Sequence, residues 1–312
     1  MRTWPHQSYP TPLAPRMGRV SSRHLSFARH SQINPRARRL SSVKVITWRE
    51  GRGRRYGTDR GDQILGLAGE IGSFIPDGSL YARDVLDRLT SPILPGKIIC
   101  VGLNYRDHAA ESQLDLPEFP ALFTKLPSAV IGPGDTIVLP ALSSEIDYEA
   151  ELGVVIGQPT RNVSPKEALG HVFGYTCVND VSARDLQSRE GFGWVRGKSP
   201  DTFCPVGPVV VTADTITDPQ ALAIDCRVNG ETVQASNTAE MIFSVAELIA
   251  FIASAVTLLP GDLICTGTPS GVGVARRPQR WLSPGDTVEV EISGIGCLRN
   301  PVAASEPAVR AR

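Results

Sequence analysis

The sequence lacks the features that would indicate a membrane or nucleic-acid partner. No apolar run approaches the roughly 20 residues of a membrane-spanning helix, because polar residues, glycine or proline interrupt each one. Neither sign of charge dominates, since 32 basic residues face 32 acidic residues. We therefore expect a soluble protein that binds neither nucleic acid nor a membrane, and whose partners must be inferred from a local site.

Cysteine is present, but not in a pattern that indicates a metal site or a disulfide framework. The six cysteines are scattered, and none forms a C-x-x-C pair with another. Four of them lie inside apolar runs that resemble strands. We expect free thiols in the core of a protein from a reducing compartment.

The first 49 residues contain no aspartate or glutamate, but nine arginines and one lysine. This composition is typical of a mitochondrial transit peptide, which would place the protein in the mitochondrial matrix. Five prolines in the same stretch disfavour the continuous amphipathic helix of such a peptide. Two alternatives remain open for residues 1–42: a disordered tail, or translated sequence upstream of a true start near Val43. In either case a bacterial cytoplasmic protein is the expectation.

Beyond residue 42 the pattern is that of a folded, strand-rich chain. We expect a small N-terminal module over residues 43–92, with a strand at 43–48 and a second strand and a small helix between 63 and 89. A catalytic domain is expected over 93–304 and a short tail over 305–312. The strands expected in the catalytic domain are short apolar runs: 97–101, 136–139, 149–156, 206–211, 223–228, 262–266 and 287–292.

Turn and helix signals support this division. Three copies of Pro-Gly-Asp, at 133–135, 260–262 and 284–286, each precede an apolar run and suit a type II turn. Ser244 and Glu247 form a capping box before an apolar helix, and a second helix is expected to open at Ser182. With little helix between the strands, the fold class is expected to be β-rich α+β.

Three carboxylates share one face of an expected strand. Asp147, Glu149 and Glu151 are spaced by two, and side chains on a strand alternate between its faces. Carboxylates held this close favour a hard divalent cation: Mg²⁺, Mn²⁺ or Ca²⁺. The alternative is a solvated acidic face, which the apolar continuation of the strand disfavours. Asp180, at the end of another apolar run, is a candidate ligand or an ordinary turn residue.

Other polar residues have the spacing of a reaction site. His108 and Glu111 are three residues apart, and on a helix they would form a base held by a carboxylate. The alternative is an incidental pair on a helix surface. Lys198 lies between loop-like segments and could neutralise an acidic substrate or simply be solvated. The turn at 267–273 matches no phosphate-binding or nucleophile motif and is read as a loop rich in backbone donors.

Together these motifs resemble the fumarylacetoacetate hydrolase (FAH) superfamily, and the resemblance spans residues 97–302. Details near residues 201–208 and 274–284 are most similar to the branch of FAH-domain-containing protein 2. The motifs that carry the resemblance occur in the order of the family: Asn104-Tyr-x-x-His108, Glu149-x-Glu151, Asn179 to Gln187, Gly197-Lys198, and Gly267 to Gly273.

The resemblance implies a mixed β-sandwich roll, usually a homodimer. It implies a site in which Mg²⁺ or Mn²⁺ chelates a 2-oxo carboxylate and stabilises its enolate. Asp147 is not among the implied ligands and would lie behind them or in solvent. The implied roles are these: metal ligands Glu149, Glu151 and Asp180; an acid/base pair of His108 and Glu111 on a lid; and substrate contacts from Arg184, Gln187, Lys198 and Thr268.

Several reactions are compatible with the site that the resemblance implies. Members of the family tautomerise, isomerise, decarboxylate or hydrolyse 2-oxo acids. Leu103 stands where acylpyruvase-like members tend to have arginine, which favours tautomerase or isomerase chemistry on oxaloacetate or a 2-hydroxymuconate-type diacid. The alternatives are C–C hydrolysis, oxaloacetate decarboxylation, or a metal-stabilised binding protein. A binding protein would need no His108 and Glu111 pair.

Overall fold

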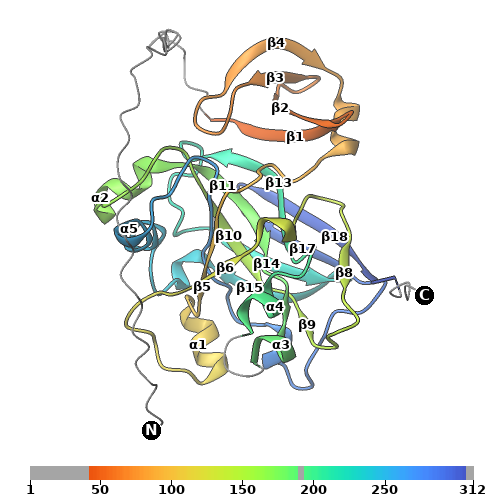
Figure 1. Ribbon diagram of the computed structural model, residues 1–312, viewed down its shortest axis with the longest axis vertical. Coiled ribbons are helices and arrows are strands. Elements are labelled where there is room, and N and C mark those ends of the chain that lie inside the picture. The colour runs from red at the N-terminus through yellow and green to blue at the C-terminus, as the bar shows by residue number, and fades with distance from the viewer. Residues whose placement is uncertain (1–41, 189–192, 307–312) are drawn as a thin grey trace, which may run out of the picture. The chain divides into compact units, whose positions relative to one another are not determined.

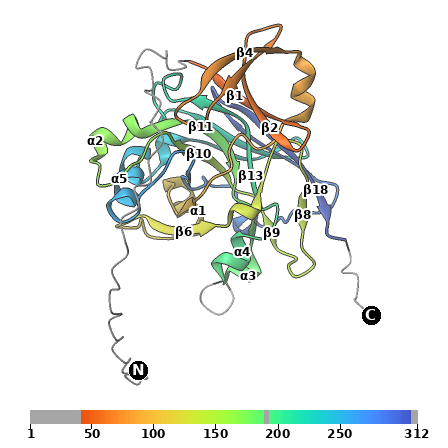
Figure 2. The ribbon, with the colours of Figure 1, turned by 45° about the horizontal axis from the view of Figure 1, so that its top comes forward.

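The computed structural model describes residues 42–188 and 193–306 (Figures 1 and 2). The described residues all belong to one compact unit, within residues 38–312. The expected disordered or targeting segment at 1–42 therefore lies outside the described residues, apart from Ser42. Within the described ranges, no helix combines the length and apolar character needed to cross a membrane.

The largest sheet has eleven strands, ten of which follow the order β4-β3-β2-β1-β13-β11-β10-β16-β5-β6 while β7 pairs with β13. Most neighbouring strands in this sheet are antiparallel, but β16 and β5 run parallel, as do β13 and β7. The strands are β1 (Lys44–Glu50), β2 (Gly53–Asp59), β3 (Ile64–Ala68), β4 (Ile75–Tyr81), β5 (Ile98–Gly102), β6 (Ala121–Lys125), β7 (Val130–Ile131), β10 (Ala150–Ile156), β11 (Val172–Asn179), β13 (Cys204–Thr212) and β16 (Leu263–Cys265).

A second sheet has five strands in the order β15-β14-β17-β18-β8, and β12 and β9 form a separate pair. In the second sheet only β18 and β8 run parallel. The strands are β8 (Ile137–Leu139), β9 (Ile146–Asp147), β12 (Ser182–Ala183), β14 (Ala223–Val228), β15 (Glu231–Asn237), β17 (Thr287–Ile292) and β18 (Gly296–Ala304).

The helices are short and lie between the strands. The α-helices are α1 (Arg106–Ser112), α2 (Pro165–Ala168), α3 (Arg184–Ser188), α4 (Trp194–Lys198) and α5 (Val245–Ala255). The 3-10 helices are η1 (Arg83–Arg88), η2 (Pro127–Ala129), η3 (Leu169–His171), η5 (Thr238–Glu240) and η6 (Gly273–Ala275).

The main core lies where β10, β11 and β13 pack against β14, β17 and β18. All seven residues of β10 are buried, which explains its nearly continuous apolar sequence. In Figure 1 these strands cross the middle of the ribbon. Mixed sheets with few helices confirm the expected β-rich α+β class. All six cysteines are free thiols, as expected, and only Cys297 is partly exposed.

The N-terminal module contains more strand than its sequence indicated. Four strands, β1 to β4, precede η1, and β1 pairs with β13, so these strands continue the main sheet. The sequence of β2, GRRYGTD, reads as a polar loop, yet it pairs along its whole length with β1. The boundary expected near residue 92 stays a prediction.

The three Pro-Gly-Asp turns are confirmed, and all three contain the same side-chain hydrogen bond. Gly134, Gly261 and Gly285 have φ of 76°, 87° and 95°, the left-handed conformation that a type II turn requires at this position. The aspartate of each copy accepts a hydrogen bond from the backbone N–H three residues earlier, at 2.7–2.8 Å. Strands β8, β16 and β17 follow directly, so each turn sets the start of a strand.

Of the two helix starts predicted from the sequence, one is confirmed and the other is wrong. Ser244 and Glu247 form the expected capping box at the start of α5. Ser182, in contrast, lies in β12, and its hydroxyl donates to the carbonyl of Asp180. The helix begins at Arg184, because pairing of β12 with β9 holds residues 182 and 183 extended.

Candidate metal and substrate site

Three buried carboxylates meet where β10 and β11 pair. Glu149 immediately precedes β10, Glu151 lies within it, and Asp180 immediately follows β11. The antiparallel register places Glu151 opposite Val178, and the Asp180 N–H donates to the Glu149 carbonyl at 2.9 Å. One oxygen from each carboxylate lies within 4.8 Å of the other two. Strand pairing thus brings a distant aspartate to the Glu-x-Glu face.

Three cations surround these carboxylates. Lys198 Nζ lies 2.6 Å from Glu149 Oε2 and 2.9 Å from Asp180 Oδ2. Arg184 contacts the other oxygen of Glu149 at 2.6 Å, and Lys125 Nζ contacts Asp180 Oδ1. Lys198 ends helix α4 and is buried, so the solvated-lysine interpretation is wrong. Each oxygen of Glu149 and Asp180 therefore has a cationic partner.

The two glutamates differ in electrostatic environment. Burial alone would raise the pKa of Glu149, but Arg184 and Lys198 outweigh burial and lower this pKa from 4.5 to about 2. For Glu151, burial and the charges of Asp180 and Glu149 act together and hold the pKa well above its usual range. Glu149 is therefore ionised at neutral pH, whereas the surroundings of Glu151 oppose its ionisation unless a further cation offsets the charge.

The arrangement fits a divalent cation. Oxygens on opposite sides of one ion are about 4 Å apart for Mg²⁺ and about 5 Å apart for Ca²⁺, so three ligand atoms within 4.8 Å of one another are near enough to share such an ion. When all four carboxylates, counting Asp147, are ionised, they carry one negative charge more than the three cations offset. Glu149, Glu151 and Asp180 could hold the ion, and the solvated-strand alternative is wrong, because all three are buried.

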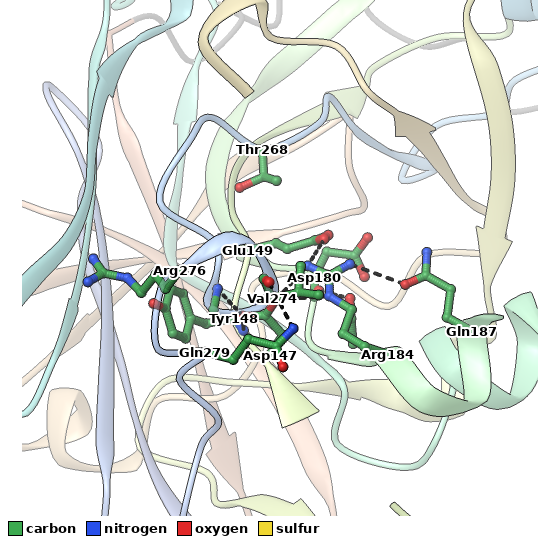
Figure 3. Close-up of polar contacts among 12 residues, drawn as sticks. Asp147, Tyr148, Glu149, Asp180, Arg184, Gln187, Thr268, Val274, Arg276 and Gln279 are labelled. Carbon is green, nitrogen blue, oxygen red and sulfur yellow. Dashed lines mark hydrogen bonds and ion pairs between the residues drawn. The ribbon is translucent and has the colours of Figure 1, made fainter. Parts of the chain in front are cut away.

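Asp147 is buried, which excludes exposure to solvent and leaves the other expected place, behind the metal-binding carboxylates. Its carboxylate accepts hydrogen bonds from the backbone N–H groups of Tyr148, Gly273 and Val274 at 2.7–3.1 Å. It also pairs with Arg184 at 2.8 Å (Figure 3). Because Arg184 reaches Glu149 as well, Asp147 lies behind the carboxylate cluster and orients the guanidinium toward it.

His108 lies on helix α1 and lines the same cavity as Glu149 and Glu151. Its Nδ1 lies 3.5 Å from Glu111 Oε2, which is longer than an ordinary hydrogen bond. Both carboxylate oxygens of Glu111 instead accept from the Gly271 N–H at 3.0 Å. The structure brings the expected pair together but gives Glu111 a second partner, the backbone of the 267–273 loop.

The remaining expected substrate contacts also line this cavity. Gln187 accepts a hydrogen bond from Arg184, and Figure 3 shows the two side chains directed toward each other. Thr268 accepts from the Gln234 amide at 2.8 Å. The cavity is lined by Val101, Gly102, Leu103, His108, Phe123, Glu149, Glu151, Arg184, Gln187, Trp194, Lys198 and Thr268.

Sequence reasoning missed two polar residues that support the site. Lys125 ends β6 with its side chain fully buried, and it also donates to the Val181 carbonyl at 3.0 Å. A lysine closing an apolar strand is a weak signal for burial. Gln234 is buried on β15, and its amide links Ala150, Thr268 and Pro269. Only the pairing of distant strands reveals either role.

Comparison with known proteins agrees with this geometry. The family model described as the C-terminal region of fumarylacetoacetate (FAA) hydrolase matches residues 97–303. The chain belongs to the fumarylacetoacetate hydrolase family. A similar protein is the mitochondrial oxaloacetate tautomerase Fahd2a of Rattus norvegicus, 45% identical over 78% of this chain and 77% of the rat protein.

Solved structures of family members share the fold. The 2-hydroxyhepta-2,4-diene-1,7-dioate isomerase of Mycobacterium marinum has a TM-score of 0.75 and 38% identity, covering 85% of this chain and 100% of that one. The 5-carboxymethyl-2-hydroxymuconate delta-isomerase of Mycobacterium smegmatis has a TM-score of 0.75 and 36% identity, covering 84% and 100%. The expected FAH-type fold and branch are confirmed.

Proposed function

We propose that this protein is a divalent-metal-dependent tautomerase or isomerase of small 2-oxo dicarboxylates, with oxaloacetate as the leading substrate. The observation that carries the proposal is the placement of His108 on the same cavity as Glu149 and Glu151. A proton-transfer group opposite a cluster of metal-binding carboxylates is the arrangement that enolate chemistry requires. The similar rat tautomerase and the two bacterial isomerases support this choice of reaction.

The roles of the side chains follow from their positions. Glu149, Glu151 and Asp180 would hold Mg²⁺ or Mn²⁺, with Ca²⁺ as an alternative, and the ion would stabilise negative charge on the enolate oxygen. His108 exchanges a proton with the substrate carbon next to the oxo group, while the enol oxygen loses or gains a proton in the opposite sense. Arg184, Gln187, Lys198 and Thr268 orient the carboxylate and oxo groups.

The test is the ketonisation of enol-oxaloacetate, followed by the loss of enol absorbance with and without Mg²⁺. His108→Ala should lower kcat by about 10²- to 10⁴-fold, the range of one general acid/base group. His171→Gln is the matched control, because His171 contacts Thr160 and does not line the cavity. Metal-independent turnover, or an unchanged His108→Ala rate, would refute the proposal.

Product analysis separates this reaction from its alternatives. Pyruvate and CO₂ from oxaloacetate would indicate a decarboxylase, and cleavage of an acylpyruvate would indicate a C–C hydrolase. Leu103 lines the cavity and supplies no cation there, which favours proton transfer over hydrolysis. No turnover of any 2-oxo acid in the presence of bound metal would instead favour a metal-stabilised binding protein.

The proposal extends to assembly and location. We expect a homodimer, measured by light scattering after size exclusion, because exposed apolar side chains cluster in sequence near β6. These are Leu114, Leu116, Phe119, Leu122 and Leu126. If the arginine-rich segment targets the chain to mitochondria, as the name of the rat relative suggests, fusing it to a reporter should direct import.

A further inference from the structure

Helix α1 carries His108 but is too short to be stable alone. It has seven residues, and among them only Ala109 is buried. Isolated helices of fewer than about 12 residues are marginal in water, so contacts with the rest of the chain must order this one. The contacts that hold α1 therefore determine where the imidazole of His108 lies.

Hydrogen bonds to other segments fix the residues at the start of α1. Asn104 is fully buried, and its amide donates to the carbonyls of Phe243 and Thr266 at 3.1 and 2.8 Å. Arg106, the first helical residue, donates to the Met241 carbonyl at 2.6 Å. These contacts fix the start of the helix, but none of them sets the rotation of α1 over the cavity.

Two side chains of α1 supply that restraint: Glu111 accepts from the Gly271 N–H, and Asp107 makes three further contacts. Its Oδ2 accepts from the Ser236 hydroxyl at 2.6 Å and from the Ser270 hydroxyl at 3.3 Å. Its Oδ1 accepts from the backbone N–H of His108 at 2.7 Å. One carboxylate thus connects α1 to β15 in the second sheet and to the loop after β16. Its charge also lies in the first helical turn, where a negative charge is favourable.

The side chain of His108 has no comparable anchor of its own. Its Nδ1 is buried, and no hydrogen-bond partner lies within reach in the part of the chain that the structure describes. Glu111 Oε2 lies 3.5 Å away, too far for an ordinary hydrogen bond, and both oxygens of Glu111 accept from the Gly271 N–H. The position of the imidazole therefore depends on the backbone of His108, and Asp107 holds that backbone.

We propose that Asp107 is a positioning residue which, through Ser236 and Ser270, holds α1 over the cavity and places His108 for proton transfer. The proposal rests on the proposed function for the role of His108. It does not depend on that function for the anchoring itself, which can be measured without turnover. Asp107 does not line the cavity and has no hydrogen bond to the three carboxylates; it reaches the site only through the backbone of His108, so its effect on the reaction is indirect.

The main test is Asp107→Ala with two readouts. Hydrogen exchange at residues 104–112 should become at least about tenfold faster, since a charged anchor worth about tenfold or more in local stability is lost. In the tautomerase assay, kcat should fall by about 10- to 100-fold. The affinity for Mn²⁺, measured by electron paramagnetic resonance, should stay within about twofold, because the carboxylate cluster is untouched.

Milder variants keep the test valid should Asp107→Ala fold poorly. Asp107→Asn retains an oxygen for the His108 N–H and should recover part of kcat. Ser236→Ala removes the shorter contact and should cost more kcat than Ser270→Ala. Ser112→Ala, at the other end of α1, is the control and should match the wild-type protein in exchange and kcat.

Two outcomes would overturn the proposal. Unchanged exchange at residues 104–112 in Asp107→Ala would show that Asp107 does not anchor α1. Faster exchange with unchanged kcat would show that the anchoring does not position His108. A wild-type protein without tautomerase activity would refute the proposed function instead, and the exchange measurement would still decide whether Asp107 anchors the helix.

Discussion

Lys125→Met is the substitution that most directly tests the electrostatic account of the site. Methionine retains the length and apolar stem of lysine but removes the charge. In the wild-type protein, the ammonium group of Lys125 pairs with Asp180, and both side chains are fully buried. It also donates to the Val181 carbonyl. The variant therefore leaves a buried carboxylate with one cation fewer and a buried carbonyl without this donor.

The expected cost follows from these contacts. Removing one partner of a buried ion pair costs about 3–5 kcal/mol in the free energy of unfolding. Asp180 keeps Lys198 at 2.9 Å, so the lower end of that range applies. A loss of about 3 kcal/mol corresponds to a fall in Tm of roughly 6 to 12 °C for a domain of this size.

The assay compares thermal unfolding in EDTA and in excess Mn²⁺. A divalent ion at Glu149, Glu151 and Asp180 would replace the lost positive charge, so the Tm gap between variant and wild type should narrow by at least about half in Mn²⁺. Lys97→Met is the control. Lys97 pairs with Asp262 at 2.7 Å but is 34% exposed and remote from the cluster.

Asp262 is buried but keeps hydrogen bonds from the backbone N–H groups of Lys97 and Leu259, and Lys97 itself is partly exposed. The control should therefore cost less than Lys125→Met and show the same Tm gap in EDTA and in Mn²⁺. If Mn²⁺ leaves the Tm difference between Lys125→Met and wild type unchanged, the reasoning is refuted. Such a result would show that the charge of Lys125 does not contribute to the charge balance of the metal site. A gap no larger than that of the control would show that the buried pair contributes little.

Three further predictions concern neighbouring groups. Asp147→Asn should weaken Mn²⁺ binding by about 10- to 100-fold, because Arg184 loses the carboxylate that orients it; titration calorimetry would measure this, and an unchanged affinity would contradict it. The raised pKa of Glu151 means that metal must displace its proton, so apparent Mn²⁺ affinity should rise with pH above 4.5, with proton release seen as buffer-dependent heat. Without metal, the free energy of unfolding should fall as the pH rises from about 4.5 through the raised pKa of Glu151. Ser244→Ala should cost about 1 kcal/mol at pH 7 in urea unfolding. Ser244 lowers the pKa of Glu247, so this stabilisation is present above pH 4.5 and is lost as pH falls through the lowered pKa.

Local patterns predicted those parts of the fold that depend on near neighbours in sequence. The alternation around Glu149 and Glu151 placed both on one strand face, and the run after them is the fully buried β10. The Ser244 capping box was predicted for the same reason, since its partners are three residues apart. Strand period and capping geometry need no knowledge of distant residues.

Predictions failed where pairing with another strand overrode the local signal. Ser182 resembles a helix cap, but pairing with β9 keeps it extended. No strand was expected at β2, whose sequence is polar, but β2 forms a hairpin with β1, which directly precedes it. Sheet pairing satisfies backbone groups whatever the local preference.

The sequence by itself determined which residue types were available for the reaction: the Glu-x-Glu strand, a histidine three residues before a glutamate, and a loop rich in backbone donors. Only the tertiary structure decided their environment. It buried Asp147 and Lys125 behind the carboxylates and attached α1 to two other segments through Asp107. Charge and hydrogen-bonding capacity are properties of single residues, whereas pKa, orientation and burial depend on groups that only folding brings within a few ångströms.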